Sequence, residues 1–472
     1  MKKCIRAICI TVVFALIMSF VACYSPFDKG NSGTVKGKFN ITIASQGTYA
    51  EQEILKIWKT AYEKKNTDVN IAISDFGDES TLLDTYMSNY ASMKDKLPMM
   101  IWVPDDQFAL WAKGGNFLDL REFYEQSAET DYSLYYETIL HAASYTGTFK
   151  PTSSYSGSYA GEKSDDAEYG LYFAPRDYNK IALVYNKELF KKFGVEAPDT
   201  TAGWDMDAFL RFVQEVADKI KAKGPAFSAY KAARLFLQWE PVYTTVFNAE
   251  ADNIIVNGKL NLSQNNLDYF TTLYDELYSY DNASQYSDTF KQGTVCMDVI
   301  CRSDFLNIVN TLTDENGNCI VDFLPFPAEE IGTGCSGYAI TKAHAEETQT
   351  VNGVTKTSKE LCWDFIKFIL SEEGQELAGA TGLLQPVLQS LEETGSWRTA
   401  ISKDLNHDAF RAGRELGLRL YDDIDPVDRT SLRGALSFFF ETLANKTEGA
   451  DDGHRAANMQ VLIDAFKNRG AY

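Results

Sequence analysis

The sequence predicts an α/β protein of two lobes, each a mostly parallel sheet flanked by helices. The chain has 472 residues, more than one hydrophobic core usually supports, so two lobes are expected. Residues 39–44 alternate as a strand, residues 51–65 place apolar side chains on one helical face, and residues 69–74 form a second strand. A strand, a helix and a second strand joined in this way form a parallel βαβ unit.

The rest of the chain is organised around residues 169–194. Two aromatic and β-branched runs are separated there by a polar loop, and a short amphipathic helix follows that Gly194 ends. Arg176, Asp177 and Tyr178 lie in the predicted loop, at the end of a buried strand, where open α/β sheets usually bind their ligands. Taken alone, this loop is better explained as a surface turn.

The N-terminus has the pattern of an export signal. Lysine and arginine residues precede an apolar run over residues 8–20, which is shorter than the roughly 20 residues that a membrane span needs. Residues 1–22 are therefore predicted to be a signal peptide. Residues 20–23, Phe-Val-Ala-Cys, resemble a bacterial lipobox, which implies a lipid on Cys23; plain cleavage beside an unmodified cysteine is the alternative. Residues 23–38 are polar and contain glycine, as a flexible tether to a membrane does.

Composition argues against several classes of function. The 66 acidic residues outnumber 45 lysines and arginines, whereas a nucleic-acid partner demands a basic face. The four histidines show no metal-ligand spacing, and the sequence has neither a Walker loop nor Gly-x-Ser-x-Gly, so we predict no metal, cofactor or catalytic residue. The five cysteines after Cys23 lack a Cys-x-x-Cys pair and are expected to be small buried residues, although a bridge such as Cys296 with Cys301 stays open.

Six segments in order resemble the bacterial extracellular solute-binding proteins, family 1, which are capture subunits of ATP-driven sugar importers. Residues 169–171 and 185–190 match the family's central signature almost letter for letter. The other matching segments are residues 116–120, 196–205, 290–297, 322–340 and 358–386. The resemblance implies a type II periplasmic-binding-protein-like fold with a hinge between the lobes.

We expect the chain to pass between the lobes more than once, as it does in that family. The Ser-, Gly- and Tyr-rich residues 145–166 have no periodicity and are expected to form a long loop or a crossing. The expected division is 39–144 and 289–343 in lobe 1, with 145–288 and the helical 344–472 in lobe 2.

Candidate ligand residues lie at strand ends and in the loops that the family uses. Carboxylates and amides can accept sugar hydroxyls, and aromatic rings stack on sugar faces. For Asp106 a helix cap, for Trp239 a core position and for Ser336 a tight turn are open alternatives. The candidates are Gln46, Tyr49, Asp105, Asp106, Arg176, Asp177, Tyr178, Trp239, Glu240, Asp298, Ser336 and Tyr338.

The resemblance implies an exported, membrane-anchored monomer that captures a carbohydrate, expected to be an oligosaccharide, between its lobes. It would deliver the ligand to the permease subunits of an ABC importer without altering it. The alternatives are a binder of another small polar solute such as a polyamine, an adhesin, and a surface-anchored carbohydrate-active enzyme, since carboxylates are plentiful.

Overall fold

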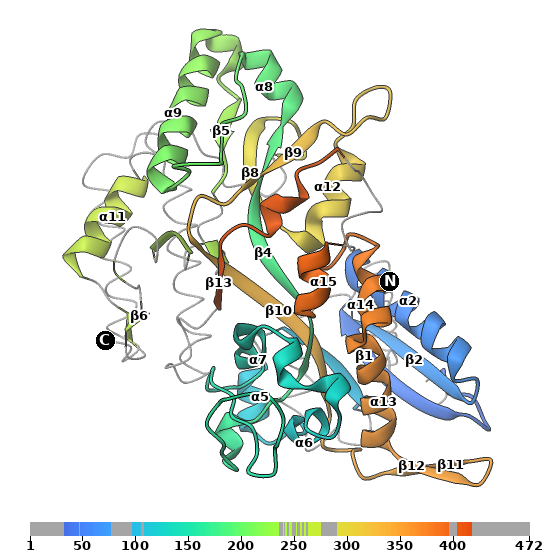
Figure 1. Ribbon diagram of the computed structural model, residues 1–472. Helices are drawn as coiled ribbons and strands as arrows, with labels where there is room; N and C mark the ends of the chain where they lie inside the picture. The colour runs from blue at the N-terminus through green and yellow to red at the C-terminus, as the bar shows by residue number, and fades with distance from the viewer. Residues whose placement is uncertain are drawn as a thin grey trace, which may run out of the picture.

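The structure is a computed structural model with two lobes that share one sheet (Figure 1). It describes residues 33–46, 48–76, 97–104, 108–235, 239, 241–242, 245–247, 252, 255–256, 259–260, 263–274, 290–395 and 404–417. The predicted signal peptide, residues 1–22, and the predicted lipid site, Cys23, lie outside these residues. Among the described residues, no helix combines the length and the apolar character of a membrane span.

Within the described residues, nine strands form the shared sheet. Their order is β2-β1-β3-β10-β4-β8-β5, with β13 beside β10 and β9 beside β4. The strands are β1 (Phe39–Gln46), β2 (Val69–Phe76), β3 (Met100–Pro104), β4 (Ala174–Asn186), β5 (Lys231–Ala233), β8 (Val295–Cys301), β9 (Val321–Pro325), β10 (Glu330–Ile340) and β13 (Arg414–Gly417). Two hairpins stand apart from the sheet: β6 (Ile255–Val256) with β7 (Lys259–Leu260), and β11 (Thr348–Val351) with β12 (Val354–Thr357).

Helices flank the sheet in both lobes (Figure 1). The α-helices are α2 (Tyr49–Lys65), α5 (Ala109–Lys113), α6 (Arg121–Tyr124), α7 (Glu137–Ala142), α8 (Lys187–Phe193), α9 (Met206–Ala222), α11 (Gln264–Tyr274), α12 (Phe305–Thr311), α13 (Ser358–Leu370), α14 (Glu372–Gly379) and α15 (Gln389–Thr394). Short 3₁₀ helices are η2 (Ala128–Thr130), η3 (Tyr132–Leu134), η4 (Ala167–Tyr169), η5 (Pro225–Phe227), η7 (Arg302–Asp304) and η9 (His407–Phe410).

The predicted βαβ unit is confirmed as β1, α2 and β2. The two strands pair in parallel from Phe39 with Val69 to Gln46 with Phe76. Helix α2 begins after Thr48, whose side chain accepts a hydrogen bond from the Glu51 N–H. Its apolar face is buried, as the periodicity predicts, and the Trp58 indole donates to the Gly374 carbonyl at 2.7 Å. Helices α2 and α14 therefore pack together in lobe 1.

Strand β4 belongs to both lobes. Its first half, from Ala174 to Lys180, pairs antiparallel with β10. Its second half, from Ile181 to Asn186, pairs with β8 and β9. One 13-residue strand thus carries the chain from lobe 1 into lobe 2, and β10 runs beside it in the opposite direction.

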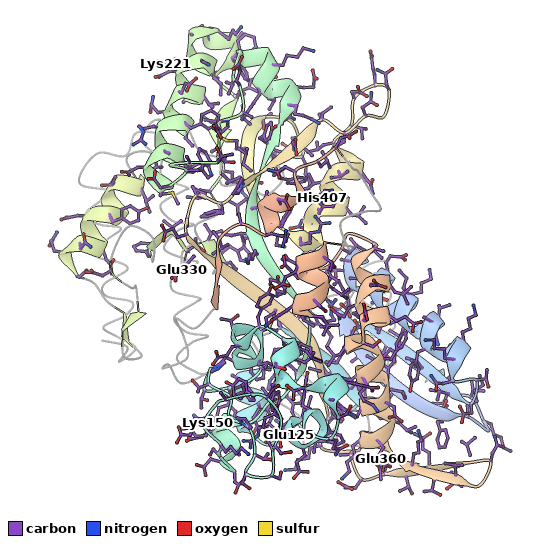
Figure 2. All side chains as sticks on the ribbon, viewed as in Figure 1. Glu125, Lys150, Lys221, Glu330, Glu360 and His407 are labelled. Atoms are coloured by element: carbon purple, nitrogen blue, oxygen red, sulfur yellow. The ribbon has the colours of Figure 1, made fainter. Side chains whose placement is uncertain are left out.

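The packing differs from the expected division of the chain. The core of lobe 1 draws on residues 39–178 and 335–391, whereas the two cores of lobe 2 draw on 181–331 and 405–410. Residues 145–166 do not cross between the lobes, because Phe149 and Tyr155 bury their rings against Tyr132 in lobe 1, at centroid distances of 4.7 and 4.9 Å. Figure 2 shows the neighbouring Lys150 in lobe 1, with Lys221 at the far end of lobe 2.

Candidate functional site

The strands of both lobes end at the junction between the lobes. We call this junction the waist, residues 176–181 of β4 and 332–336 of β10. Strands β1 and β3 are parallel, and β3 and β4 are each antiparallel to β10, so β1 and β3 run with β4 toward lobe 2. Strand β8 is antiparallel to β4 and parallel to β5, so both run toward lobe 1. The carboxyl ends of the strands, where open α/β sheets bind ligands, therefore meet at the waist from both sides.

In lobe 1, the buried carboxylate of Glu51 links helix α2 to strands β1, β4 and β10 beside the waist. Glu51, in the first turn of α2, is 1% exposed. Its Oε1 accepts hydrogen bonds from the Ser45 hydroxyl of β1 at 2.8 Å and from the Tyr338 hydroxyl of β10 at 2.5 Å. Its Oε2 lies 2.5 Å from Nη2 of Arg176 on β4. A buried carboxylate is tolerated when it is paired and hydrogen-bonded in this way.

Arg176 holds a second carboxylate on its other side. Its Nη1 lies 3.3 Å from Oδ2 of Asp177, and its guanidinium lies over the Trp58 ring at 5.8 Å. Burial lowers the pKa of Arg176, but the charges of Asp177 and Glu51 outweigh it and the pKa is raised overall. The arginine therefore stays charged in the interior.

Asp177 links β4 to β10. Its Oδ1 accepts hydrogen bonds from the Ser336 N–H at 3.0 Å and from the Ser336 hydroxyl at 2.9 Å. The register of the two strands shifts between Ser336 and Gly337. A carboxylate side chain thus takes the place of a backbone acceptor where the two strands enter the waist.

Tyr338 completes the cluster from β10. Burial, and then the charge of Glu51, raise the pKa of its hydroxyl well above the ordinary value. Its ring meets the Trp58 ring edge-on, with centroids 6.5 Å apart. Tyr338 is therefore a neutral donor that fixes the Glu51 carboxylate.

Lobe 2 presents a simpler pair at its strand ends. Nη1 of Arg234, the residue after β5, lies 2.9 Å from Oδ2 of Asp298 on β8. The Val299 N–H also donates to Asp298, at 2.8 Å. Burial raises the pKa of Asp298 to about 6, although the charge of Arg234 acts in the opposite direction.

Three side chains, one at the end of β1, one on β3 and one near the start of β4, have buried polar atoms without a hydrogen-bond partner in the part of the chain that the structure describes. They are Oε1 of Gln46, Nε1 of Trp102, and Nε and Nη1 of Arg176. Nη1 is the atom 3.3 Å from Asp177, which is an ion pair without hydrogen-bond geometry. Because unpartnered buried polar groups are costly, these atoms are candidates for contact with a ligand or with water.

The comparison with family models decides the identity of the chain. The model of the bacterial extracellular solute-binding proteins matches residues 58–403. The chain belongs to this family. A search among curated proteins finds no match.

Solved structures resemble this solute-binding protein over nearly their whole length. An ABC substrate-binding protein from Listeria monocytogenes in complex with cycloalternan has 16% identity and a TM-score of 0.67, covering 92% of this chain and 99% of that one. The GacH receptor of Streptomyces glaucescens, studied with acarbose, has 16% identity and a TM-score of 0.63, with 91% and 99% covered. The sugar-binding protein MalE from Xanthomonas citri has 14% identity and a TM-score of 0.64, with 91% and 97% covered. At these identities the likeness establishes the two-lobed fold.

Four of the predicted site residues of the solute-binding protein come together. Arg176, Asp177, Ser336 and Tyr338 all belong to the lobe 1 cluster. The interpretation of residues 176–178 as a surface turn is wrong, because β4 is continuous there and all three side chains are buried. Gln46 ends β1 beside this cluster.

The other described candidates lie elsewhere. Asp298 is on the lobe 2 side of the waist. Tyr178 is fully buried, its N–H donates to the Gln385 carbonyl at 3.4 Å, and its ring packs edge-on against Tyr136. Trp239 is partly buried against the lobe 2 core, in keeping with the core alternative.

Four predicted positions remain without a structural account. Asp105, Asp106 and Glu240 lie outside the described residues. Tyr49 is the first residue of α2, but its side chain is not among those described.

The sequence interpretation missed Glu51 and Trp102. Thr48 and Glu51 match the Thr-x-x-Glu pattern of a capping box, which explains a glutamate in a first helical turn without any further role. Trp102 lies in the continuous apolar run of residues 99–103, a pattern that indicates a buried strand and no ligand contact. The indole N–H of Trp102, a polar group on an otherwise apolar strand, is the feature of the sequence that could have indicated a ligand contact.

Neither metal ligands nor disulfides are evident in the described ranges. No group of three histidine, cysteine, aspartate or glutamate side chains there could hold a metal ion. The described cysteines form no disulfide, so the bridge between Cys296 and Cys301 that stayed open is not formed. They are Cys296, Cys301, Cys319, Cys335 and Cys362.

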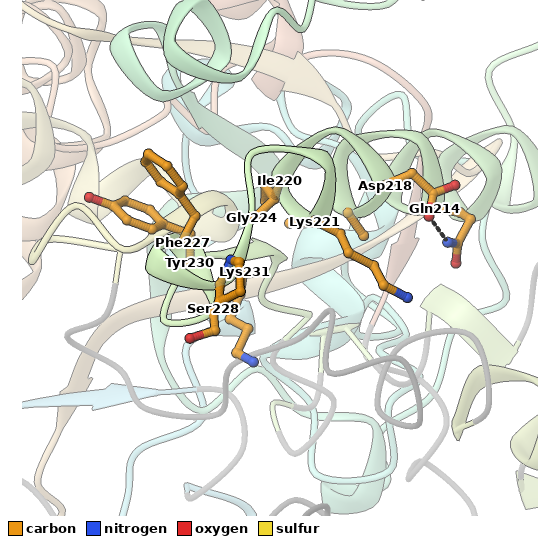
Figure 3. Close-up of a pocket in the computed structure, with 12 residues that line it drawn as sticks. Gln214, Asp218, Ile220, Lys221, Gly224, Phe227, Ser228, Tyr230 and Lys231 are labelled. Carbon is orange, nitrogen blue, oxygen red and sulfur yellow. Dashed lines mark hydrogen bonds between the residues drawn. The ribbon is translucent and has the colours of Figure 1, made fainter.

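One cavity lies away from the waist, on lobe 2 (Figure 3). It has a volume of about 470 Å³ and lies between the C-terminal half of α9, η5 and the start of β5. Because Lys231 in its wall begins β5, the cavity is at the opposite end of that strand from the waist and does not contribute to the candidate site.

Proposed function

We propose that this protein captures a carbohydrate at the waist and delivers it, unaltered, to the permease of an ABC importer. The proposal depends mainly on one observation: the carboxyl ends of strands from both lobes meet at the waist. Buried charged side chains that form hydrogen bonds lie there in each lobe. The sugar ligands of the Listeria and Streptomyces proteins support it. Ligand contacts from both lobes would stabilise a closed state, as in other hinged binding proteins.

The unpartnered polar atoms favour a neutral polyhydroxylated ligand. Gln46 offers an acceptor, whereas Trp102 and Arg176 offer donors. A sugar hydroxyl can both donate and accept, so one class of ligand satisfies all three residues. A polyamine at neutral pH only donates, and an anion would meet the carboxylates of Glu51 and Asp177. These mismatches favour a carbohydrate over both alternatives.

The localisation is part of the proposal. Residues 1–22 direct export, Cys23 carries the lipid, and residues 23–38 tether a monomeric domain to the membrane. Family membership as an extracellular protein supports export. Incorporation of radiolabelled palmitate into the wild type, and its loss in Cys23→Ala, would be the expected result; equal labelling of both would contradict the anchor.

A thermal-shift panel of maltose, maltotriose, cycloalternan and spermidine tests the ligand class. A ligand at a hundred times its Kd adds roughly 2.7 kcal/mol to the free energy of unfolding. We expect at least one carbohydrate, but not spermidine, to raise the Tm. A shift with spermidine alone would favour the polyamine alternative, and chromatography showing cleavage of the sugar would favour the enzyme.

Gln46→Ala gives the proposal a test at one residue. Oε1 of Gln46 has no hydrogen-bond partner among the described residues. Removing this acceptor should weaken carbohydrate binding roughly tenfold, which is about 1.4 kcal/mol, while the unliganded Tm changes little. Gln349→Ala is the matched control, because Gln349 binds the backbone of Asn40 at the other end of β1. Calorimetry should give the control the wild-type Kd. Equal weakening by both substitutions would remove Gln46 from the site.

A further inference from the structure

We propose that Glu51 is a positioning residue that couples ligand binding in lobe 1 to the bending of the strands between the lobes. The inference rests on the proposed function, since lobe closure around a ligand is the event that Glu51 would transmit. It concerns a residue that the sequence did not indicate and that need not touch the ligand itself.

The first link joins Glu51 to the strand ends of lobe 1. Its carboxylate holds Ser45 at 2.8 Å and Tyr338 at 2.5 Å. Ser45 directly precedes Gln46, whose Oε1 has no hydrogen-bond partner among the described residues. A ligand that binds Gln46 would therefore act on the residue adjacent to a Glu51 contact.

The second link joins Glu51 to the waist. Glu51 pairs with Arg176 at 2.5 Å, and the next residue on β4, Asp177, holds both the N–H and the hydroxyl of Ser336. The Gln375 side chain donates to the Arg176 carbonyl at 3.1 Å and so fixes the backbone of β4 from α14. Because β4 and β10 are the strands that connect the lobes, a rotation between the lobes changes the torsions of this segment.

The two links share one buried cation, so they are energetically coupled. Arg176 balances the carboxylates of Glu51 and Asp177 in the interior, where separating either partner leaves an uncompensated charge. The cluster therefore either moves as a unit or breaks at a substantial cost. This is a physical connection between two places, of the kind that coupling requires.

The backbones at the same point leave little freedom for independent movement. A Cβ on Gly337 would lie 2.0 Å from the Ala174 carbonyl oxygen, so β10 lies tight against β4 directly after Ser336. Bending is then transmitted between the two strands rather than absorbed by a loose contact.

Glu51→Gln tests the coupling. The amide keeps an oxygen for Ser45 and Tyr338 but removes the charge that holds Arg176. With maltotriose as the probe, or the carbohydrate with the largest thermal shift, we expect an unchanged association rate and a roughly tenfold faster dissociation rate in stopped-flow measurements. Small-angle scattering at saturating ligand should give a radius of gyration between the open and closed values of the wild type.

Asp119→Asn is the matched control, because Asp119 pairs with another buried arginine, Arg121, at 2.7 Å in lobe 1. It should lower the Tm while closure and dissociation stay at wild-type values. Ser336→Ala, which removes a single hydroxyl, serves as a second probe and should change dissociation in the same direction as Glu51→Gln.

The outcomes separate the two proposals. Wild-type closure and dissociation in both Glu51→Gln and Ser336→Ala would overturn the coupling. Failure of the wild type to bind any carbohydrate would instead overturn the proposed function.

Discussion

The two lobes bring different buried charges to the waist. In lobe 1, Arg176 is held between Glu51 and Asp177, and its pKa is raised despite burial. In lobe 2, Arg234 pairs with Asp298, yet burial raises the pKa of that carboxyl to about 6. The same residue types thus give an arginine that stays charged in one lobe and a carboxyl that can take up a proton in the other. Burial is the main cause of the raised pKa of Asp298.

Replacing Arg176 or Arg234, each in a separate variant, should have the largest effect on the free energy of unfolding, and the two losses should differ. Arg176→Met leaves two buried carboxylates without their cation, and breaking a buried ion pair costs roughly 3–5 kcal/mol. Arg234→Met should cost less, because Asp298 can be protonated near its raised pKa. Urea denaturation at pH 6 measures both free energies of unfolding. Equal losses of unfolding free energy in the two variants would contradict the difference between the lobes.

A methyl group at Gly337 tests how tightly the strands between the lobes are packed. Gly337→Ala places its Cβ 2.0 Å from a backbone oxygen of β4, so the strands must shift, at a cost of roughly 1–3 kcal/mol. Gly353→Ala in the β11–β12 turn meets no atom within 4 Å and has strain only from its φ of 82°. The midpoints of denaturant unfolding should show the larger loss for Gly337→Ala. A smaller loss there would mean that the waist accommodates the methyl group easily.

The third expected effect is the pH dependence of Asp298. Its pKa rises from 3.8 when unfolded to about 6 when folded, so the folded state binds more protons between these values. Its contribution to the free energy of unfolding therefore falls as the pH rises from about 4 to about 6. The difference between wild type and Asp298→Asn, measured by urea denaturation from pH 4 to 7, should follow this course. A difference that does not change with pH would contradict the raised pKa.

Local patterns predicted the elements whose contacts are local. The apolar face of α2 and its Thr48 cap follow from residues within one helix. Strand β4 could not be found in the same way, since Pro175 and the polar residues 176–180 indicate a turn when only neighbours are considered. Arg176 and Asp177 are buried because of partners far along the chain. Ser336 is 159 residues from Asp177, and Glu51, which pairs with Arg176, is held by Tyr338, 287 residues away.

The candidate site was predicted in part for the same reason. The end of a predicted strand indicated Arg176 and Asp177, and a family motif contains Ser336 and Tyr338, but no pattern in the sequence indicates that Glu51 joins Arg176 to Tyr338. The packing departs from the expected division at residues 145–166. Their composition resembles that of a loop between lobes, but their aromatic rings pack against Tyr132 in lobe 1. Aromatic content, rather than the Ser and Gly content, was the informative property of that stretch.

The late position of β10 in the sequence determines the order in which the two lobes can be completed during synthesis. Lobe 1 lacks this strand until the ribosome has made the whole stretch between Asp177 and Ser336, which contributes most of the lobe 2 cores. Closing so long a loop costs entropy that the final contacts must outweigh. A nascent chain can therefore assemble most of lobe 2 before lobe 1 is complete, and until then the edge of β3 that β10 will occupy stays open and prone to wrong pairing.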